Sequence, residues 1–332
     1  MKLNLKVKHI ETEKILVGVE DRNLLVFKTH FGFDVSIFNG DIIVDTDESK
    51  RELLEQIFKT LILLAEHKIL LTERDVIYII KMAEVDQLDN ILSLYKNQAK
   101  ILVTESGKTI SAKTFNQRAY SEALDKYPLV FGIGPAGTGK TYLAVAHAVS
   151  RLKKGLVKKV ILTRPAVEAG ESLGFLPGDL KEKVDPYLIP LYDALYEFLG
   201  VKETTLLMEK GVIEVAPLAY MRGRTLENAF IILDEAQNTT KSQMKMFLTR
   251  LGFSSYMVVT GDPSQVDLGY KKESGLKDAI ELVKGISEAK VIQFDKVDVI
   301  RHPLVQKILE RYEAYENWIP WLYTRKYCKT LC

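Results

Sequence analysis

The sequence predicts an α/β protein in which one parallel sheet is covered by helices on both faces and is preceded by a smaller α/β domain. Apolar runs typical of buried strands alternate with helix-length segments in the second part of the chain, and a glycine-rich loop directly follows the first run. Since parallel strands need crossover connections that cover both faces of their sheet, this alternation indicates a parallel sheet. The five runs are Pro128–Ile133, Lys159–Thr163, Ala229–Leu233, Tyr256–Thr260 and Lys290–Phe294.

Composition narrows the class of protein. The 332 residues, 47% hydrophobic and 27% charged, suffice for one or two cores and exclude collagen-like and wholly disordered chains. Two cysteines, Cys328 and Cys332, cannot build a disulfide framework or a four-ligand zinc site. The net charge of +2 neither requires nor excludes a polyanionic partner.

Targeting signals are not evident in the sequence. The longest uncharged stretch, Tyr127–Gly139, is shorter than the about 20 residues that a membrane-spanning helix needs. The N-terminus alternates charged and apolar residues and lacks the continuous apolar core of a secretion signal. We therefore expect a cytoplasmic protein with no membrane partner.

Four segments are expected along the chain. Residues 1–95 are predicted to form the small α/β domain, with a hairpin at Phe33–Asp45 that turns at Asn39-Gly40. The polar residues 96–113 are expected to be a linker, and residues 114–312 to hold the parallel sheet. Residues 313–332 are an aromatic and basic tail, which could dock on the protein itself or on a neighbouring subunit, or contact RNA or a membrane.

The glycine-rich loop is a full match to the Walker A pattern, and its context is the expected one of strand, loop and helix. Glycines allow the backbone to wrap a phosphate, with amide groups at a helix N-terminus that attracts anions. Lys140 is expected to reach the β- and γ-phosphates, and the Thr141 hydroxyl to ligate Mg²⁺. The predicted nucleotide-binding residues are Gly134, Pro135, Ala136, Gly137, Thr138, Gly139, Lys140 and Thr141.

Two acids follow the run Ala229–Leu233 and should lie at the carboxyl edge of the sheet, where ligands collect in such folds. Asp234 is expected to hold Mg²⁺ through water, and Glu235 to orient and deprotonate the attacking water. Small-molecule kinases do not need such a base. Hydrolysis is therefore favoured over phosphoryl transfer to an alcohol.

Residues after the next two strands are candidates for γ-phosphate contacts. Gln265, in Gly261-Asp262-Pro-Ser-Gln265, carries an amide that can sense this phosphate. An arginine usually stabilises a transition state with charge on the γ-phosphate oxygens, and Arg301 is the first candidate for this role. The other candidates are Arg164, Arg222 and Arg224.

The base of the nucleotide is expected to be adenine. Gln117 precedes the loop by roughly twenty residues, and its amide can read the adenine edge as donor and acceptor together. Asp295-Lys-Val-Asp298 differs by one residue from the guanine-reading Asn-Lys-x-Asp motif, but it lacks the asparagine and lies at a predicted strand end. ATP is therefore the predicted nucleotide.

The motifs above resemble those of the PhoH-like ATPases, phosphate-starvation-inducible proteins whose core is similar to that of superfamily 1 helicases. The resemblance spans about residues 114 to 310, and its longest stretch, Thr163–Lys183, is highly specific. The other matching stretches are Phe131–Ala144, Tyr220–Thr225, Ile231–Asn238 and Val259–Asp267.

The resemblance implies a P-loop NTPase (RecA-like) core that binds and hydrolyses ATP. It implies the nucleotide loop at Gly134–Thr141, the metal and water carboxylates at Asp234 and Glu235, and γ-phosphate contacts at Gln265 and Arg301. It also implies a link to RNA. Arg164, Arg222 and Arg224 are the candidate RNA contacts near the sheet edge.

Two further consequences concern the N-terminal domain and assembly. Family members often carry a KH-like domain, but the Gly-x-x-Gly loop that clamps RNA in this module has no counterpart here, where Val19–Asn23 takes its position.

Only about 200 residues follow Thr114, which is room for one sheet. We expect a homo-oligomer, plausibly a ring, in which a neighbouring subunit supplies the second wall of the site.

Two functional hypotheses follow. The first is an ATPase that couples hydrolysis to RNA binding or remodelling, as a helicase does. The alternative is a nucleotide-switched regulatory module that acts on a protein partner, with Gly170–Leu195 as a docking surface or moving loop.

Overall fold

A computed structural model describes residues 1–165, 180–268, 273–301, 304, 305, 307–309, 311, 312 and 315, with side chains omitted for 180–187. The chain divides into two compact units, Met1–Lys96 with Ile300–Cys332, and Asn97–Val299. In the described parts, no helix has the length and the apolar character needed to cross a bilayer.

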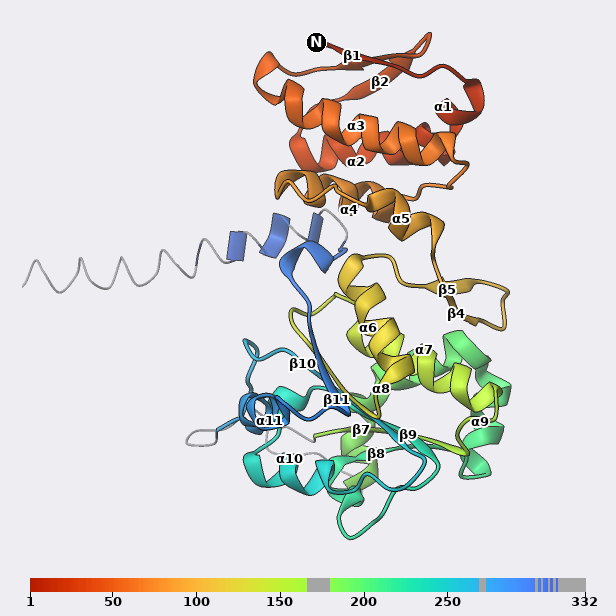
Figure 1. Ribbon diagram of the computed structural model, residues 1–332, viewed down its shortest axis with the longest axis vertical. Coiled ribbons are helices and arrows are strands. Elements are labelled where there is room, and N and C mark those ends of the chain that lie inside the picture. Colours follow the sequence, from red (N-terminus) through yellow and green to blue (C-terminus); the bar gives the residue numbers. More distant parts are fainter. Residues whose placement is uncertain are drawn as a thin grey trace, which may run out of the picture. The chain divides into compact units, whose positions relative to one another are not determined.

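The first unit has a three-stranded antiparallel sheet in the order β1-β3-β2, packed against helices (Figure 1). Its strands and α-helices follow each other as a strand, two helices, two strands and three further helices, as expected of a small α/β domain. The elements are β1 Lys2–Lys6, α1 Ile10–Val17, η1 Val19–Asp21, α2 Arg22–Phe31, β2 Val35–Phe38, β3 Asp41–Val44, η2 Glu48–Lys50, α3 Arg51–Glu66, α4 Glu73–Glu84 and α5 Ile91–Lys96.

The predicted hairpin is present as β2 and β3. Its turn residues Asn39 and Gly40 have φ values of 52° and 78°, the two positive values that a type I′ turn requires. A Cβ atom on Gly40 would lie 2.3 Å from the carbonyl oxygen of Val7, so the turn also needs glycine for space. Local turn chemistry therefore fixes the pairing of these two strands.

The second unit is built on a six-stranded parallel sheet in the order β11-β6-β10-β9-β7-β8. All five predicted strands are present. Its elements are β4 Lys100–Val103, β5 Thr109–Ser111, α6 Phe115–Lys126, β6 Leu129–Ile133, α7 Lys140–Lys153, β7 Lys159–Arg164, α8 Leu180–Leu199, α9 Val201–Glu209, β8 Ile213–Pro217, η4 Leu218–Met221, β9 Ala229–Leu233, η5 Ala236–Asn238, α10 Lys241–Leu248, β10 Tyr256–Gly261, α11 Gly275–Val283, β11 Ala289–Gln293 and η6 Lys296–Asp298.

Strand β8 was not predicted. Its sequence, Ile-Glu-Val-Ala-Pro, contains a charged residue and ends in proline, so it lacks the continuous apolar run of the other strands. Among the residues that the structure describes, it lies at the edge of the sheet and pairs only with β7. An edge strand tolerates a charge and a terminal proline because one side has no strand partner, which explains why its signal is weak.

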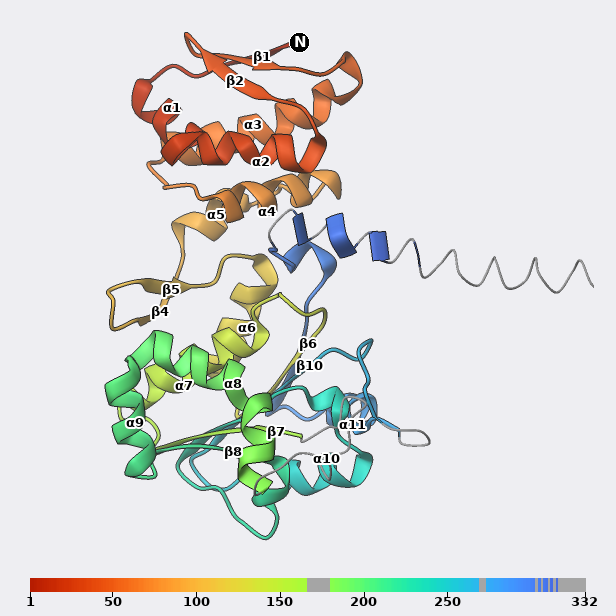
Figure 2. The same ribbon diagram turned by 180° about the vertical axis from the view of Figure 1, so that it is seen from behind.

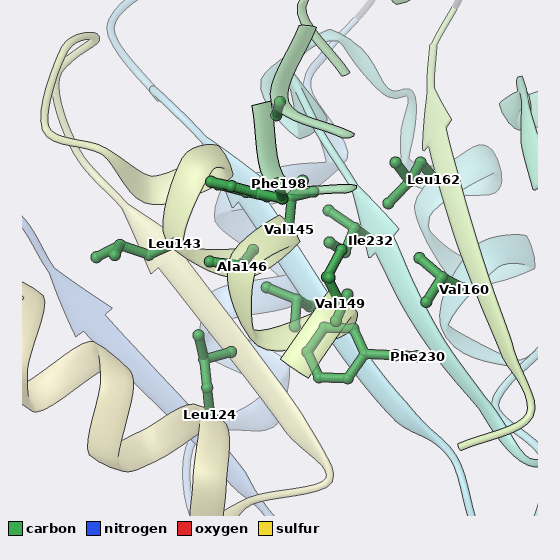
Figure 3. Packing of buried hydrophobic residues seen from close by; sticks show 14 of the residues in the cluster. Leu124, Leu143, Val145, Ala146, Val149, Val160, Leu162, Phe198, Phe230 and Ile232 are labelled. Carbon is green, nitrogen blue, oxygen red and sulfur yellow. The ribbon is translucent and has the colours of Figure 1, made fainter. Parts of the chain in front are cut away.

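Helices cover both faces of this sheet, as predicted (Figure 2). On one face Phe230 and Ile232 of β9 pack with Val145 and Val149 of α7 (Figure 3). On the other face the alternate β9 side chains join Phe247 of α10 and residues of α11. Each fully buried Phe or Leu contributes about 1.5–3 kcal/mol, so the two apolar faces of β9 hold both helical layers against the sheet.

The N-terminal part of the first unit ends at Lys96, next to the expected boundary after residue 95, whereas the later boundaries differ from the expected ones. Within residues 96–113, expected to be a linker that contains two short β-like runs, these runs pair as the antiparallel hairpin β4–β5. Its side chains Ile101, Leu102 and Ile110 are buried in the core cluster that includes α7. Residues from Ile300 onward group with the first unit instead of the sheet domain. Apart from Tyr315, the predicted tail 313–332 lies outside the described residues.

Candidate nucleotide-binding site

The loop between β6 and α7 has a backbone that depends on glycine. Gly134, Gly137 and Gly139 have φ values of 142°, 84° and 82°, which L side chains rarely adopt. At Gly134 a Cβ atom would also lie 2.4 Å from the carbonyl oxygen of Phe294. Gly139 caps the N-terminus of α7. The loop therefore curls tightly at the positive end of a helix.

Lys140 is the first residue of α7 and is largely buried. Its ammonium donates hydrogen bonds of 2.6 Å to the carbonyl oxygens of Gly134 and Pro135. The charge is thus held within the curl of the loop. Together with the helix N-terminus it makes this region attractive to phosphate groups.

Gln117 lies beneath the same loop. Its side-chain nitrogen donates to the carbonyl oxygen of Thr138 at 3.0 Å, and its side-chain oxygen accepts from the Lys113 amide at 2.8 Å. The amide group therefore ties the start of α6 to the loop. The adenine contact that we predict for Gln117 stays a prediction.

Asp234 comes directly after β9 and is buried. Its Oδ1 accepts hydrogen bonds from the hydroxyls of Thr141, at 2.6 Å, and Thr260, at 2.7 Å. Because β9 lies beside β10, the ends of these two strands meet at one edge of the sheet. The two residues predicted to hold Mg²⁺, Thr141 and Asp234, are thus in direct contact, and their oxygen atoms are the ligand type that Mg²⁺ prefers.

Arg164, at the end of β7, pairs with both acids. Its guanidinium donates to Oδ2 of Asp234 at 2.8 and 3.2 Å and to Oε1 of Glu235 at 3.2 Å. Arg164 is a candidate both for the γ-phosphate arginine and for an RNA contact; the structure pairs it with the two acids, and both roles stay predictions. The pairing arises because β7 lies next to β9, so the ends of these two strands are neighbours.

The two acids differ in exposure. The side chain of Asp234 is 5% exposed and that of Glu235 is 43% exposed. Asp234 is therefore largely shielded from water, whereas Glu235, although it also accepts a hydrogen bond from Arg164, is partly exposed to water. This difference fits one acid for the metal and one for the water.

A hollow of about 260 Å³ brings most of the predicted residues together. It joins the loop, the two acids and the segment after β10, including Gln265. Its lining residues are Ala136, Gly137, Gly139, Lys140, Thr141, Tyr142, Asp234, Glu235, Gly261, Asp262 and Gln265.

Sequence reasoning missed Gln237. This residue is buried, and its side-chain nitrogen donates to Oε2 of Glu235 at 2.5 Å. The only available signal was its place two residues after Glu235 within the stretch Ile231–Asn238.

The remaining predicted arginines are not part of this hollow. Arg301 lines another hollow of about 280 Å³ in the first unit, together with Arg22 and Arg74. Arg224 forms a bidentate ion pair with Glu214, with N–O distances of 2.6 and 2.7 Å. The Glu214 carboxylate raises the pKa of Arg224. The γ-phosphate contact of Arg301 stays a prediction.

Arg222 is exposed and borders a separate hollow of about 330 Å³. The other lining residues come from η4 and α10 and are Ala219, Ser242, Gln243 and Met246. Among the described residues, no hydrogen bond or ion pair engages the Arg222 guanidinium.

Solved structures that resemble this chain are ATPase and helicase cores. One, titled a Sulfolobus solfataricus SWI2/SNF2 ATPase core in complex with dsDNA, has a TM-score of 0.35 and 16% identity, and the match covers 60% of this chain and 47% of that one. A Pif1 helicase from Candida albicans has a TM-score of 0.28 and 15% identity, with 54% and 39% covered.

Curated relatives match far more closely. A PhoH-like protein of Bacillus subtilis is 53% identical over 94% of this chain and 97% of its own length. A PhoH-like protein of Mycobacterium tuberculosis is 47% identical over 91% of this chain and 85% of its own length. Protein PhoH of Escherichia coli is 42% identical over 70% of this chain and 67% of its own length.

The family model described as PhoH-like protein matches residues 109–313, which include all the residues that line the nucleotide hollow. The sheet with its Walker A loop is that of a P-loop NTPase. On the family match and on identities this high over most of both chains, this chain belongs to the PhoH-like protein family.

Proposed function

We propose that this protein binds ATP with Mg²⁺, hydrolyses it, and couples hydrolysis to RNA binding or remodelling. The observation that carries the proposal is the single hollow that joins Lys140, Thr141, Asp234 and Glu235. A phosphate-binding loop, an oxygen pair suited to Mg²⁺ and an exposed carboxylate are the parts that NTP hydrolysis needs.

Each residue has a defined role in the proposed reaction. The loop amides and Lys140 bind the phosphates, and Thr141 and Asp234 hold Mg²⁺, which supplies neutralisation of phosphate charge. Glu235 orients a water and accepts its proton as the new oxygen–phosphorus bond forms. The bond between the γ-phosphorus and the bridging oxygen breaks, so that ADP and inorganic phosphate leave. Gln265 contacts the γ-phosphate oxygens through its amide.

The test of this function is phosphate release by the purified protein, with ATP or GTP, with and without single-stranded RNA, at two salt concentrations. We expect Mg²⁺-dependent hydrolysis of ATP that RNA stimulates, and weaker stimulation at high salt because phosphate contacts release counterions. Absence of hydrolysis under all conditions would refute the proposal. Faster turnover of GTP than of ATP would refute the adenine assignment.

The RNA part of the proposal is supported by the hollow beside Arg222. The exposed guanidinium can bind a backbone phosphate, and Ser242 and Gln243 add polar groups. Tyr220 lies in the sequence between Ala219 and Arg222, which line this hollow. It is 47% exposed and can stack on a base. These are the features of a surface for single-stranded nucleic acid.

Replacing Arg222 by alanine should weaken RNA binding and RNA stimulation, with basal hydrolysis preserved. One lost phosphate contact should flatten the dependence of log K on log salt by about 0.7 for a single strand. Fluorescence anisotropy with labelled RNA measures both quantities. Lys158→Ala is the matched control, since it removes an exposed charge just before β7, at the opposite end of that strand from Arg164. Equal RNA binding by both variants would contradict the assignment.

The alternative function is a nucleotide-switched module that acts on a protein partner. Its proposed surface, residues 170–195, lies partly outside the described residues. Stimulation of hydrolysis by a protein partner and none by RNA would favour it over the RNA proposal.

We also infer that the protein acts as a homo-oligomer, plausibly a ring. The described part of the second unit holds one parallel sheet, whose strand ends form one wall of the nucleotide hollow. Arg301 is grouped with the other unit.

If Arg301 acts across a subunit interface, Lys140→Ala and Arg301→Ala subunits should each be inactive and should recover hydrolysis when mixed. Sedimentation should show species larger than the 37.7 kDa monomer. An active monomer, or no recovery on mixing, would contradict this arrangement.

A further inference from the structure

The Gln237 side chain connects two parts of the nucleotide site. Its nitrogen donates to Oε2 of Glu235 at 2.5 Å, and its oxygen accepts from the backbone amide of Asp262 at 3.0 Å. Gln237 belongs to η5, directly after the two acids, and is 1% exposed. One neutral amide group thus links the acid after β9 to the loop after β10.

The end of β10 packs closely against the Gln237 side chain. A Cβ atom on Gly261 would lie 2.9 Å from the side-chain oxygen of Gln237 and 3.2 Å from its backbone nitrogen. Gly261 has no positive φ value, so glycine is needed here for space and not for conformation. The end of β10 is therefore shaped to fit Gln237.

The neighbouring residue of η5 holds the other end of the same loop. Asn238 is 8% exposed, and its side-chain oxygen accepts from the Asp267 amide at 2.8 Å. Two consecutive amide side chains thus fix residues 262 and 267. Gln265 lies between these two anchors.

Glu235 itself is held from both sides. Arg164 contacts Oε1 and Gln237 contacts Oε2, so each carboxylate oxygen has one donor. The Glu235 backbone has a φ value of 53°, a left-handed conformation that is unfavourable for a non-glycine residue. Its position is therefore imposed by its surroundings and depends on these contacts.

We propose that Gln237 is a positioning residue that aims the Glu235 carboxylate at the attacking water and couples it to the loop that carries Gln265. A shift of the loop on contact with the γ-phosphate would move the Asp262 amide, then the Gln237 side chain, then Glu235. Water activation is thereby linked to the presence of the γ-phosphate. The inference rests on the proposed role of Glu235 as the base.

The test is Gln237→Met, a side chain of similar length that can neither donate nor accept these hydrogen bonds. A misplaced base should lower kcat for ATP on the order of 10²-fold. KM and the affinity for a non-hydrolysable ATP analogue should stay unchanged, because the phosphate-binding loop is not altered. Gln98→Met is the matched control, since it removes a glutamine hydrogen bond of 3.1 Å to Ser111 in the same unit and should leave kcat as it is.

A second variant covers the case in which Gln237→Met does not fold. Gln237→Glu keeps an acceptor for the Asp262 amide but puts a second carboxylate against Glu235. It should lower kcat and leave binding of the ATP analogue intact. Thermal unfolding of each variant shows whether it is folded.

The double variant Glu235→Gln/Gln237→Met separates positioning from a general structural effect. If Gln237 acts through Glu235, the double variant should be no slower than Glu235→Gln alone. A normal kcat in folded Gln237→Met and Gln237→Glu, or additive losses in the double variant, would overturn the inference while the proposed function stands. An inactive wild type, or full activity of Glu235→Gln, would refute the proposed function instead.

Discussion

Lys140→Ala is expected to abolish ATP hydrolysis and to weaken nucleotide binding strongly. The substitution removes the ammonium that the structure holds against the carbonyl oxygens of Gly134 and Pro135, at the N-terminus of α7. Loss of one preorganised group that stabilises transition-state charge typically lowers kcat on the order of 10²–10³-fold. Titration with a fluorescent ATP analogue and phosphate release measure the two effects.

The matched control is Lys153→Ala, which removes an exposed lysine from the last turn of the same helix. It should leave binding and hydrolysis unchanged, because it lies at the opposite end of α7 from the loop. Thermal unfolding must be compared as well, since Lys140→Ala leaves two loop carbonyl oxygens without their donor. A folded Lys140→Ala protein that hydrolyses ATP at the wild-type rate would show that the loop does not serve the reaction.

Glu235→Gln is expected to separate binding from turnover. Glutamine has nearly the same shape, and its oxygen can still accept from Arg164, but it cannot take a proton from water. General base catalysis contributes about 10²–10⁴-fold, so kcat should fall by that factor while ATP affinity is retained. Single-turnover phosphate release and analogue titration on the same sample measure both quantities.

Glu227→Gln is the matched control for this second variant. Glu227 is exposed and precedes β9, at the opposite end of the strand from Glu235. It should leave kcat as in the wild type. If Glu235→Gln turned over as fast as this control, the base would have to be another residue.

Local sequence determined much of the fold and the main parts of the site. The five central strands were predictable because each is a continuous apolar run, which a strand buried on both faces requires. The loop Gly134–Thr141 was predictable because its glycines serve backbone conformations that few other residues adopt. Asp234 and Glu235 were placed correctly at the sheet edge because parallel strands all end there. The apolar patterns of edge strand β8 and hairpin β4–β5 are weaker in the sequence. Their strand structure depends on packing in the folded protein.

The contacts of the site side chains were decided by the order of strands in the sheet. Strands β6 and β7 follow each other in sequence, yet β10 and β9 lie between them. This order puts the end of β7 beside β9 and so brings Arg164 to the two acids. It also puts the end of β10 beside β9, where Gln237 can reach the Asp262 amide. The sequence by itself determined which chemical groups end the strands, whereas the tertiary structure decided which of them touch, because neighbours in a parallel sheet are set by crossover packing and not by position along the chain.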